Sequence, residues 1–426
     1  MMRSNFFHRM RAATLSAIKH LRANRANKVR PDDPEAVEYE SLEPREMLSA
    51  APIAQMIARP LIDANPQATF NTVSGYTPAQ IRHGYGFDRA LFNNGTIQGD
   101  GTGQTIAIID AYDDTNIIND VTAFDRQFGL AGTDATGVGK FLTRVAPQGK
   151  ATDPSGGWQM EMALDVEWAH AMAPGAKILL VEAKSASLGN LIAAVDYARR
   201  QKGVSAVSMS WGATEFSGLQ TLDSHFTSAN RQGITFIAAA GDNAGAMLWP
   251  AVSSHVLAVG GTTLNLDSAG NYLAGTEAAW SDGGGGTSQY SPKPAFQNGV
   301  NSTRFRMTPD VAFNADPATG FAVYSSVPWQ GNNGWFRVGG TSAGAPQWAS
   351  LLAIANQGRA LSGKGSLDGF SQVLPAVYHA GGGIATSSFH DITSGSNGNA
   401  ARAGFDAATG QGTPFSDLVI ADLLKV

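Results

Sequence analysis

Short apolar runs alternate with amphipathic segments along the middle of this 426-residue chain. In GDGTGQTIAIIDAY, residues 99–112, a polar turn precedes an apolar run, and AKILLVEA, residues 176–183, is a second run of the same kind. Uninterrupted apolar strands of this length are buried on both faces, as they are in parallel sheets covered by helices. The pattern therefore predicts an α/β fold with a mostly parallel central sheet and helices on both faces.

The same alternation continues on both sides of these runs. Thr77 followed by Pro78 has the pattern of a helix N-cap and first helical residue. In open sheets of this class, chemistry gathers beyond the C-terminal ends of the strands, so catalytic side chains are expected in the loops that follow them. The further helices that we expect are 187–201 and 219–233, and the further strands are 204–212, 234–245 and 256–264.

The first 76 residues are predicted to be a basic leader, an export segment and a linker, mostly disordered, ahead of one large domain over 77–426. Residues 1–30 carry eight Lys and Arg and no acid, without the solid apolar core of an ordinary signal peptide. YESLEPREMLSAAP, residues 39–52, is similar to the LEPR-type export segment of surface and secreted proteins of planctomycete-like bacteria. That resemblance implies export to the cell surface or the extracellular space.

Composition excludes several classes of protein. The chain has no cysteine, which removes disulfides, thiolate chemistry and cysteine-bound zinc. The formal net charge is −5 although residues 1–30 are basic, so the remainder is acidic and argues against nucleic acid as a partner. No run of about 18 apolar residues exists, and we expect no membrane span. We expect the chain to be a monomer.

VGGTSAGAPQWASLLAIANQ, residues 338–357, places Ser342 in a Gly-rich turn that leads into an apolar helix pattern. At a helix N-terminus, unpaired backbone N–H groups and the helix dipole favour developing negative charge, and Pro346 fits the first turn. A serine hydroxyl becomes a good nucleophile when a base lies beside it. No histidine stands in a setting that suggests this role, so the base of this candidate nucleophile must lie elsewhere. The alternative is a structural turn.

GGWQMEMALDVEWAHAMAPGAKI, residues 156–178, contains the second candidate, the carboxyls of Glu161 and Asp165. Four residues apart on a helix, these two side chains share one face, whereas Glu167 falls on the other side. Their neighbours are apolar, and two carboxyls in a dry setting share a proton, because one apparent pKa rises. Such a pair can serve as a base at acidic pH. The alternative is a solvated pair on the surface.

Residues 234–245 are expected to be an apolar strand that runs into a Gly-rich loop, and Asp242 stands after the strand and before the loop, in the sequence AAAGDNAG. An aspartate in a Gly-rich turn is usually a turn former. At the end of a strand, however, a neutral Asp can donate a hydrogen bond to a developing oxyanion. The residues alone leave both interpretations open.

FHDITSGSNGNAARAGFDAATGQGTP, residues 389–414, has the donors of a site for a hard cation. Asp391 and Asp406 flank a loop rich in Gly and Asn, whose backbone carbonyls add neutral oxygen ligands. Oxygen ligation of this kind suits Ca²⁺, although the spacing is not that of an EF-hand. The alternative is a turn-rich loop without a metal.

Together these segments resemble the sedolisin family of serine-carboxyl peptidases, which have a subtilisin-like fold. The motifs that carry the likeness run in order from about Thr77 to the C-terminus: ExxLD, SWG, GD, GGT, PDV with ADPxTG, GTSxxxP and a C-terminal DI and GFD pair. Each motif is weak alone, and the ordered set is specific. The resemblance implies a secreted endopeptidase, active at acidic pH on protein or peptide substrates.

The resemblance gives each candidate a role in catalysis. Ser342 would be the nucleophile, and Glu161 would be the general base and then the general acid. Asp165 would share the proton of Glu161 and orient it. Asp242 would be the acid of the oxyanion hole. The base that the Ser342 turn requires is then a carboxylate instead of a histidine.

The resemblance also implies two supporting elements. Asp110 and Trp211 would extend the hydrogen-bond network behind Glu161. Arg402 stands where glycine is usual in the family, which a carbonyl ligand tolerates if the backbone angle allows. One Ca²⁺ would be held by the side chains of Asp391 and Asp406 and the carbonyls of Ile392, Arg402 and Gly404, with water as the sixth ligand.

Two other functions stay open. An ordinary subtilisin-like peptidase needs a histidine at an HGT-type helix start, and neither His170 nor His255 has that context. The second is a catalytically silent surface or binding protein on the same fold. It is favoured by a departure from the family, in which a long folded pro-domain is usual, whereas about 76 residues precede the domain here. The sequence does not set the cleavage-site preference, and internal cleavage is expected by analogy.

Overall fold

The computed structural model describes residues 53–69, 72–131, 134–229, 232–379 and 383–426. The chain divides into two units, residues 1–50 and 51–426, and the second carries the fold. The predicted basic leader and export segment lie outside the described residues. Among the described residues, no helix is both long and apolar enough to cross a membrane.

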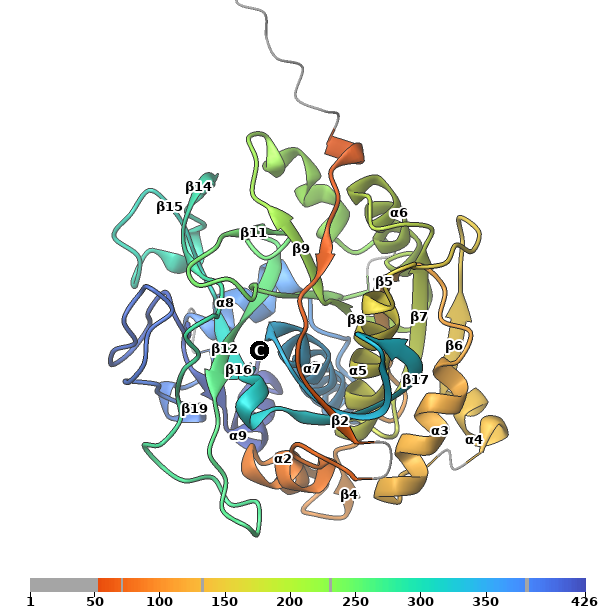
Figure 1. Ribbon diagram of the computed structural model, residues 1–426. Helices are drawn as coiled ribbons and strands as arrows, with labels where there is room; N and C mark the ends of the chain where they lie inside the picture. The colour runs from red at the N-terminus through yellow and green to blue at the C-terminus, as the bar shows by residue number, and fades with distance from the viewer. Residues whose placement is uncertain (1–52, 70–71, 132–133, 230–231, 380–382) are drawn as a thin grey trace, which may run out of the picture. The chain divides into compact units, whose positions relative to one another are not determined.

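An eight-stranded sheet forms the centre of the second unit (Figure 1), with the strand order β13-β12-β10-β8-β5-β7-β6 and β16 also paired to β12. All of its pairings are parallel except that of β13 with β12, which confirms the predicted mostly parallel sheet. Its strands are β5 (Thr105–Ala111), β6 (Leu142–Val145), β7 (Lys177–Ala183), β8 (Val204–Met209), β10 (Thr235–Ala239), β12 (Val256–Thr263), β13 (Ala278–Ala279) and β16 (Val311–Asn314).

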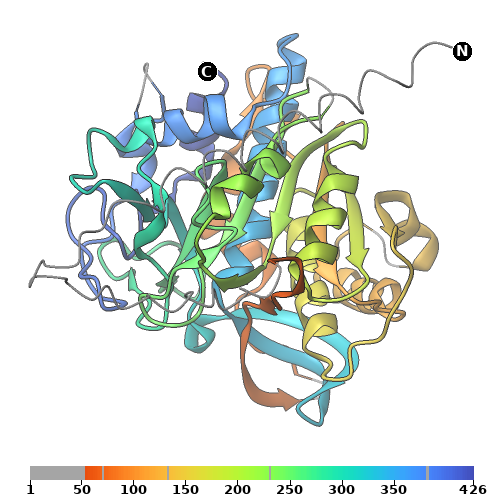
Figure 2. The same ribbon diagram turned by 90° about the horizontal axis from the view of Figure 1, so that it is seen from above.

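Helices cover both faces of this sheet, as Figures 1 and 2 show. α5 and α7 pack against each other and against β5, while α6 packs against β5, β7 and β8 from the opposite side. α5 is buried along its whole length, although it carries the three acids Glu161, Asp165 and Glu167. The α-helices are α2 (Pro78–Gly84), α3 (Ile117–Phe128), α4 (Ala135–Phe141), α5 (Gly157–Met172), α6 (Leu188–Ala198), α7 (Gly344–Leu361), α8 (Leu374–Val377) and α9 (Ser416–Leu423).

Local sequence signals account for most of these elements. Thr77 caps α2 with the full capping box, in which its side chain and that of Gln80 bond each other's backbone N–H. The helix predicted over 219–233 is a 3₁₀-helix instead, η3 (Leu219–Phe226), which ends at Thr227 in extended backbone. The strand predicted over 204–212 divides at Ser210 into β8 and a separate strand, β9 (Trp211–Thr214).

Smaller sheets surround the central one. β1 and β11 flank β9, β2 and β17 flank β18, and three two-stranded ribbons are β14-β15, β19-β20 and β3-β4. Their bounds are β1 (Arg59–Pro60), β2 (Asp63–Thr69), β3 (Leu91–Phe92), β4 (Ile97–Gln98), β11 (Leu248–Trp249), β14 (Gly286–Pro292), β15 (Phe305–Thr308), β17 (Phe321–Trp329), β18 (Asn332–Gly339), β19 (Phe389–His390) and β20 (Thr413–Pro414).

The linker expected up to residue 76 is replaced by strands over residues 59–69. β1 pairs antiparallel with β9, and β2 pairs antiparallel with β18. Partners far along the chain fix this segment, and a pattern within residues 1–76 cannot reveal such pairing. The α/β unit therefore includes residues ahead of the predicted boundary at residue 77.

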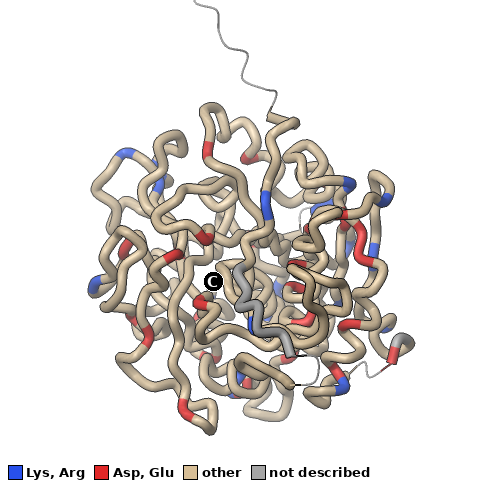
Figure 3. The backbone as a smooth tube through the Cα atoms, viewed as in Figure 1, with Lys and Arg blue, Asp and Glu red and all other residues tan. Residues whose placement is uncertain are grey.

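Acidic side chains are buried far more often than basic ones. Figure 3 shows several Asp and Glu residues toward the middle of the view, while most Lys and Arg lie toward its rim. Within the described residues, the buried Lys and Arg side chains are those of Arg306 and Arg359. Since burial disfavours the charged form of a carboxyl, many of these acids must find a partner or keep a proton.

Candidate active site

Glu161 and Asp165 lie one turn apart on α5, and both are fully buried. α5 packs against α7 and β5, so this face of the helix points into the molecule. The alternative of a solvated surface pair is therefore wrong. Glu167, which falls on the other side of the helix, is also buried, and it accepts a hydrogen bond from the backbone N–H of Tyr324 (3.1 Å).

Ser342 lies in a single 3₁₀ turn, η6 (Thr341–Ala343), which leads directly into α7 as the sequence predicts. Its hydroxyl donates to the carbonyl oxygen of Ser210 (3.2 Å). The hydroxyl of Ser210 in turn donates to Asp165 Oδ1 (2.9 Å) and approaches the carbonyl oxygen of Ser342 (3.3 Å). Ser210 thus links the α5 carboxyl to the Ser342 turn.

Sequence reasoning missed Ser210. The signal was present in SMSWG, where Ser210 stands between β8 and β9, beyond the C-terminal end of a parallel strand. That is the edge of the sheet at which chemistry is expected.

Burial raises the pKa of Glu161 well above its ordinary value, and the charges of Asp165 and Asp110 raise it further. Ser342 lies close enough to lower the pKa of Glu161, although no hydrogen bond of ordinary geometry reaches either Glu161 oxygen within the described residues. Burial also raises the pKa of Asp165, Asp110 adds to the rise, and the hydrogen bond from Ser210 opposes it. The pair therefore keeps a shared proton to a higher pH than an ordinary acid does.

Asp110 and Trp211 lie behind this pair, at the end of β5 and the start of β9. Burial and the charge of Glu182 raise the pKa of Asp110 to about 8. Trp211 Nε1 donates to the backbone carbonyl of Ile109 (2.9 Å), and the two Asp110 oxygens have no hydrogen-bond partner in the described part of the chain. When ionised, Asp110 raises the pKa of Glu161 through its charge, and within the described residues its carboxyl makes none of the hydrogen bonds expected behind Glu161.

Asp242 follows β10 and is tied to the turn that carries Ser342. Its Oδ1 accepts from the backbone N–H (2.8 Å) and the hydroxyl (2.7 Å) of Thr341. Gly340 has φ = 103°, and a Cβ there would lie 2.6 Å from Asp242 Oδ2. Glycine at this position gives the backbone its left-handed conformation and leaves room for the carboxyl. The charge of Asp242 also contributes to the raised pKa of Glu161.

The two histidines weighed for an ordinary subtilisin-like mechanism face other partners. His170, on α5, stacks on Phe141, and its Nε2–H donates to the carbonyl oxygen of Ala131 (2.9 Å). His255 stacks on Phe370 and lies beside the Asp223 carboxyl. The contacts of these two rings involve neither Glu161 nor Ser342.

The loop predicted to hold Ca²⁺ is closed by its own two carboxylates. The N–H of Gly404 donates to both Asp391 oxygens (3.1 Å each), and the N–H of Arg402 donates to Asp406 Oδ2 (2.9 Å). The two acids thus approach the same short stretch of backbone. Among the described residues, no group of three or more His, Asp or Glu side chains is arranged for a metal, so a cation here would draw on backbone carbonyls, including that of Ile392. Two carboxylates and several carbonyls are a donor set that fits Ca²⁺.

Comparison with known proteins places the chain among peptidases. The model of the subtilase family matches residues 144–364. Kumamolisin of Bacillus sp. (strain MN-32) is 33% identical over 390 residues, which cover 82% of this chain and 64% of kumamolisin. Sedolisin of Pseudomonas sp. (strain 101) is 30% identical over 355 residues, which cover 75% of this chain and 57% of that protein. The chain thus spans less than two thirds of the length of these two relatives.

A solved structure is similar over nearly all of its own length. It is that of Pseudomonas sedolisin, a serine-carboxyl proteinase, complexed with two molecules of pseudo-iodotyrostatin. The TM-score is 0.68 at 27% identity, and the match covers 82% of this chain and 98% of that one. The likeness confirms the subtilisin-like fold that the sequence predicts.

Proposed function

The chain belongs to the sedolisin family of serine-carboxyl peptidases, within the subtilases, and we propose that it hydrolyses peptide bonds at acidic pH. The observation that carries this proposal is the chain of contacts from Ser342 through Ser210 to Asp165, beside the buried Glu161. A serine nucleophile needs a base, and the group at hand is a carboxyl whose pKa burial raises.

In the proposed reaction Ser342 Oγ attacks the substrate carbonyl, and Glu161 takes the hydroxyl proton. Glu161 then returns this proton to the leaving amine. Asp165 shares a proton with Glu161, and Ser210 holds Asp165 in place through its 2.9 Å hydrogen bond. For this reaction the Ser342 hydroxyl turns from the Ser210 carbonyl toward Glu161, whose pKa already responds to it.

Asp242 is proposed to stabilise the oxyanion. Its Oδ1 accepts from two donors of Thr341, and its Oδ2 lies on the side of Gly340, next to the Ser342 turn. A protonated carboxyl there donates a hydrogen bond where negative charge develops. A carboxylate would repel the same charge, so this role requires acidic conditions.

We therefore expect activity to fall as the pH rises above about 6, because the shared proton of the Glu161–Asp165 pair and the proton of Asp242 are lost. We propose that the substrates are proteins or peptides cleaved at internal bonds and that the chain acts as a monomer. We also propose that it is exported, which rests on the sequence of residues 39–52. Fractionation of the cells that make it would test export, and retention in the cytoplasm would contradict it.

We propose that residues 391–406 bind one structural Ca²⁺. Asp391 and Asp406 would supply charge, and the carbonyls of Ile392, Arg402 and Gly404 would supply neutral oxygens. When bound, the ion offsets the two negative charges and ties the loop to β19. The test is thermal unfolding with and without a Ca²⁺ chelator, beside Asp391→Asn. Chelation should lower the Tm of the parent chain and change that of the variant little; no shift in the parent would contradict the site.

The experiment that tests the proposed activity is hydrolysis of denatured casein at pH 4 by the full chain and by Ser342→Ala. The matched control is Ser362→Ala, since Ser362 is exposed beyond the end of α7. We expect hydrolysis by the parent and by the control and none by Ser342→Ala. A folded parent chain without activity would contradict the proposal and favour a silent binding protein on this fold.

A further inference from the structure

The outer edge of β17 is completed by side chains instead of a neighbouring strand. β17 lies at one end of the β17-β18-β2 sheet, so in the described part of the chain no named strand pairs with its outer edge. The N–H of Tyr324 donates to Glu167 Oε2, and the N–H of Ser326 donates to Asp120 Oδ2 (3.1 Å each). Backbone groups on a covered edge need such partners. Two carboxyls, one from α5 and one from α3, therefore hold this edge.

Both helices also pack directly on β17. Figure 1 shows β17 alongside α5, with α3 close by, and residues of both helices contact the strand. Trp168 Nε1 of α5 donates to the carbonyl oxygen of Ala322 (2.9 Å), and the rings of Trp168 and Phe321 pack edge to face. The position of β17 thus depends on contacts between its outer edge and the two helices.

Glu167 and Asp120 belong to a group of four buried acids, which we call the acid cluster: Asp114, Asp120, Asp125 and Glu167. Each of the four side chains belongs to a residue that is 0% or 1% exposed. Each has at least one oxygen without a hydrogen-bond partner among the described residues, and for Asp125 this is true of both oxygens. Buried carboxyls in this state cost less free energy when they carry a proton.

Burial raises the pKa of every member of the acid cluster. It raises the pKa of Asp114 to about 6, that of Asp120 to about 6 and that of Asp125 to about 8. Burial raises the pKa of Glu167 well above its ordinary value, and the charges of the other three acids raise it further. An Asp that water reaches releases its proton near 4. The packed arrangement of β17 therefore binds more protons between about pH 4 and pH 8, and it loses stability as the pH rises through this range.

The neighbouring cations are paired with other acids. Arg144, on β6, contacts Glu182 (2.6 Å) and Asp113 (2.8 Å), and Lys150 contacts the same Asp113 oxygen (2.8 Å). The charge of Arg144 lowers the pKa of Asp114, but burial outweighs this effect and the charge of Asp113 opposes it. Arg144 and Lys150 thus make their ion pairs beside the acid cluster and not with it.

The other groups that face the acid cluster are neutral at mildly acidic and neutral pH. His170 Nε2 lies 3.5 Å from Asp125 Oδ2, but burial lowers the pKa of His170 to about 4. Arg126, the basic residue of α3, is exposed, and residues 321–336, which include β17, contain no charged side chain. Ionisation of the acid cluster therefore brings like charges together at a site that faces neutral groups.

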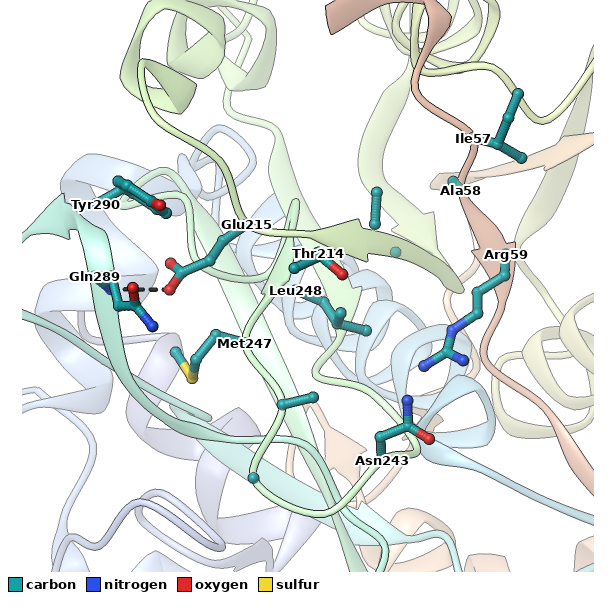
Figure 4. Close-up of a pocket in the computed structure, with 14 residues that line it drawn as sticks. Ile57, Ala58, Arg59, Thr214, Glu215, Asn243, Met247, Leu248, Gln289 and Tyr290 are labelled. Carbon is teal, nitrogen blue, oxygen red and sulfur yellow. Dashed lines mark hydrogen bonds between the residues drawn. The ribbon is translucent and has the colours of Figure 1, made fainter. Parts of the chain in front are cut away.

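An acid at the cleft has a setting that tolerates charge. Glu215 accepts from the hydroxyl of Ser288 (2.5 Å) and the N–H of Gln289 (2.9 Å), and it lines a cavity of 680 Å³. Figure 4 shows its carboxyl beside Gln289 at the wall of this cavity. Water in such a cavity solvates an ionised carboxyl. The four members of the acid cluster do not line this cavity, so their charges would lack that solvation.

We propose that the acid cluster is a pH-sensitive switch that sets the position of β17. On the acid side, the neutral carboxyls of Glu167 and Asp120 hold the edge of β17 against α5 and α3. As the pH rises past neutral, the cluster ionises and its members repel one another. The edge of β17 then separates from the two helices, and water reaches the acids.

The Ser342 turn would follow this movement. β17 pairs with β18 from Phe321 opposite Val338 to Ser325 opposite Gly334, and β18 leads directly into that turn. Separation of β17 would therefore loosen the turn and stop catalysis at neutral pH through a change of structure. This last step rests on the proposed peptidase activity, whereas the movement of β17 does not.

The test is amide hydrogen exchange, measured by mass spectrometry, in the full Ser342→Ala chain at pH 5 and pH 8. After correction for the intrinsic exchange rates, we expect the protection of residues 321–329 to be lower at pH 8 by about 10-fold or more. The protection of β12, in the central sheet, should change much less.

The variants are made in the same Ser342→Ala chain. Glu167→Gln combined with Asp120→Asn removes both charges and keeps both acceptors, since an amide oxygen can still accept from the N–H groups of β17. This double variant should keep most of the protection of residues 321–329 at pH 8, and Glu167→Gln alone should shift the loss to higher pH. The matched control is Glu215→Gln, an acid outside the cluster, which should leave the loss unchanged.

Several results would overturn the switch. These are equal protection of residues 321–329 at both pH values, an equal loss in the double variant, or the same loss in β12, which would mean that the whole unit unfolds. Casein hydrolysis at pH 4 by the parent chain, together with any of these results, would leave the peptidase activity standing. Loss of β17 protection in a chain whose parent does not hydrolyse casein would support the switch and contradict the peptidase activity.

Discussion

Two buried acids in this fold have opposite electrostatic surroundings. Asp310 is held by a bidentate contact from Arg306 (2.7 and 3.1 Å), both side chains being fully buried, and it also accepts from the hydroxyl of Tyr378 (2.6 Å) and the N–H of Ala258 (2.8 Å). Glu161 is equally buried, but what surrounds it is Asp165 and other acids.

The difference separates a structural acid from a reactive one. A carboxylate with a cation and several donors is satisfied in its charged form and has little reason to exchange a proton. A carboxyl buried among other carboxyls is satisfied when it carries a proton, and so it can give and take one. Changing the Asp310 site should therefore affect stability, and changing the Glu161 site should affect activity.

Glu161→Gln should break the reactive site without unfolding the chain. We expect kcat for peptide hydrolysis to fall by about 10⁴-fold or more, since the serine loses its base, while the midpoint of urea unfolding stays near that of the parent. The matched control is Glu167→Gln on the same helix, whose amide oxygen can still accept from Tyr324 N–H. A large loss of activity in both variants would show that burial of α5, and not the base, is what was damaged.

Arg306→Met should have the opposite effect: it should lower the stability of the chain and leave the reactive site in place. It leaves the Asp310 charge buried without its cation, which costs about 3–5 kcal/mol of unfolding free energy. Arg304→Met, two residues away and exposed, serves as the control and should cost less than about 1 kcal/mol. Urea denaturation in the Ser342→Ala background measures both changes without self-digestion. An Arg306→Met chain as stable as the parent would remove the contrast between the two acids.

Asp242 is a further test of the contrast between structural and reactive acids, because its proposed role requires a protonated carboxyl. Asp242→Ala should lower kcat by about 10²–10³-fold through loss of one oxyanion donor. Asp242→Asn should lose much less, because the amide oxygen can accept from Thr341 while the amide nitrogen donates at every pH. Steady-state kinetics of the two variants at pH 4 and pH 7 check this. Equal losses in both variants at both pH values would contradict an oxyanion role.

The most gradual of the expected effects is on stability as a function of pH. The folded chain keeps a proton on Asp110 up to a pKa of about 8, whereas an unfolded Asp releases it near 4. Between these values the folded state binds more protons, so stability should fall as the pH rises, by up to about 1.4 kcal/mol per pH unit for this group. Asp110→Asn should flatten the slope of unfolding free energy between pH 4 and 8, and the exposed Asp282→Asn should leave it unchanged. A slope that Asp110→Asn does not alter would contradict the raised pKa.

Sequence patterns predicted what is encoded locally. The buried strands, the capped helix at Thr77 and the shared face of Glu161 and Asp165 follow from the period and the burial of neighbouring residues. Asp242 follows the strand pattern of β10. Loops that follow parallel strands meet at one edge of the sheet, where chemistry is expected, and this is where Asp242 lies.

What the sequence could not predict depends on distant pairing. Residues 59–69 show no strong alternation of apolar and polar side chains. They form strands because they pair with β9 and β18. The link through Ser210 depends on how β8 and α5 approach one another, which spacing along the chain does not reveal. Trp211 was expected in the network behind Glu161, and its indole N–H is taken instead by the Ile109 carbonyl of the neighbouring β5.

The central claim is that a buried pair of carboxyls, which shares one proton and so can accept a second, replaces histidine as the base beside Ser342. The most direct test is kcat/KM for hydrolysis of an internally quenched fluorogenic peptide, measured between pH 3 and pH 8. The account predicts the highest value on the acid side and a steady fall above about pH 6 as protons are lost from the acids of the site. A value that stays undiminished to pH 8 would contradict it, because the site would then be working without its protons.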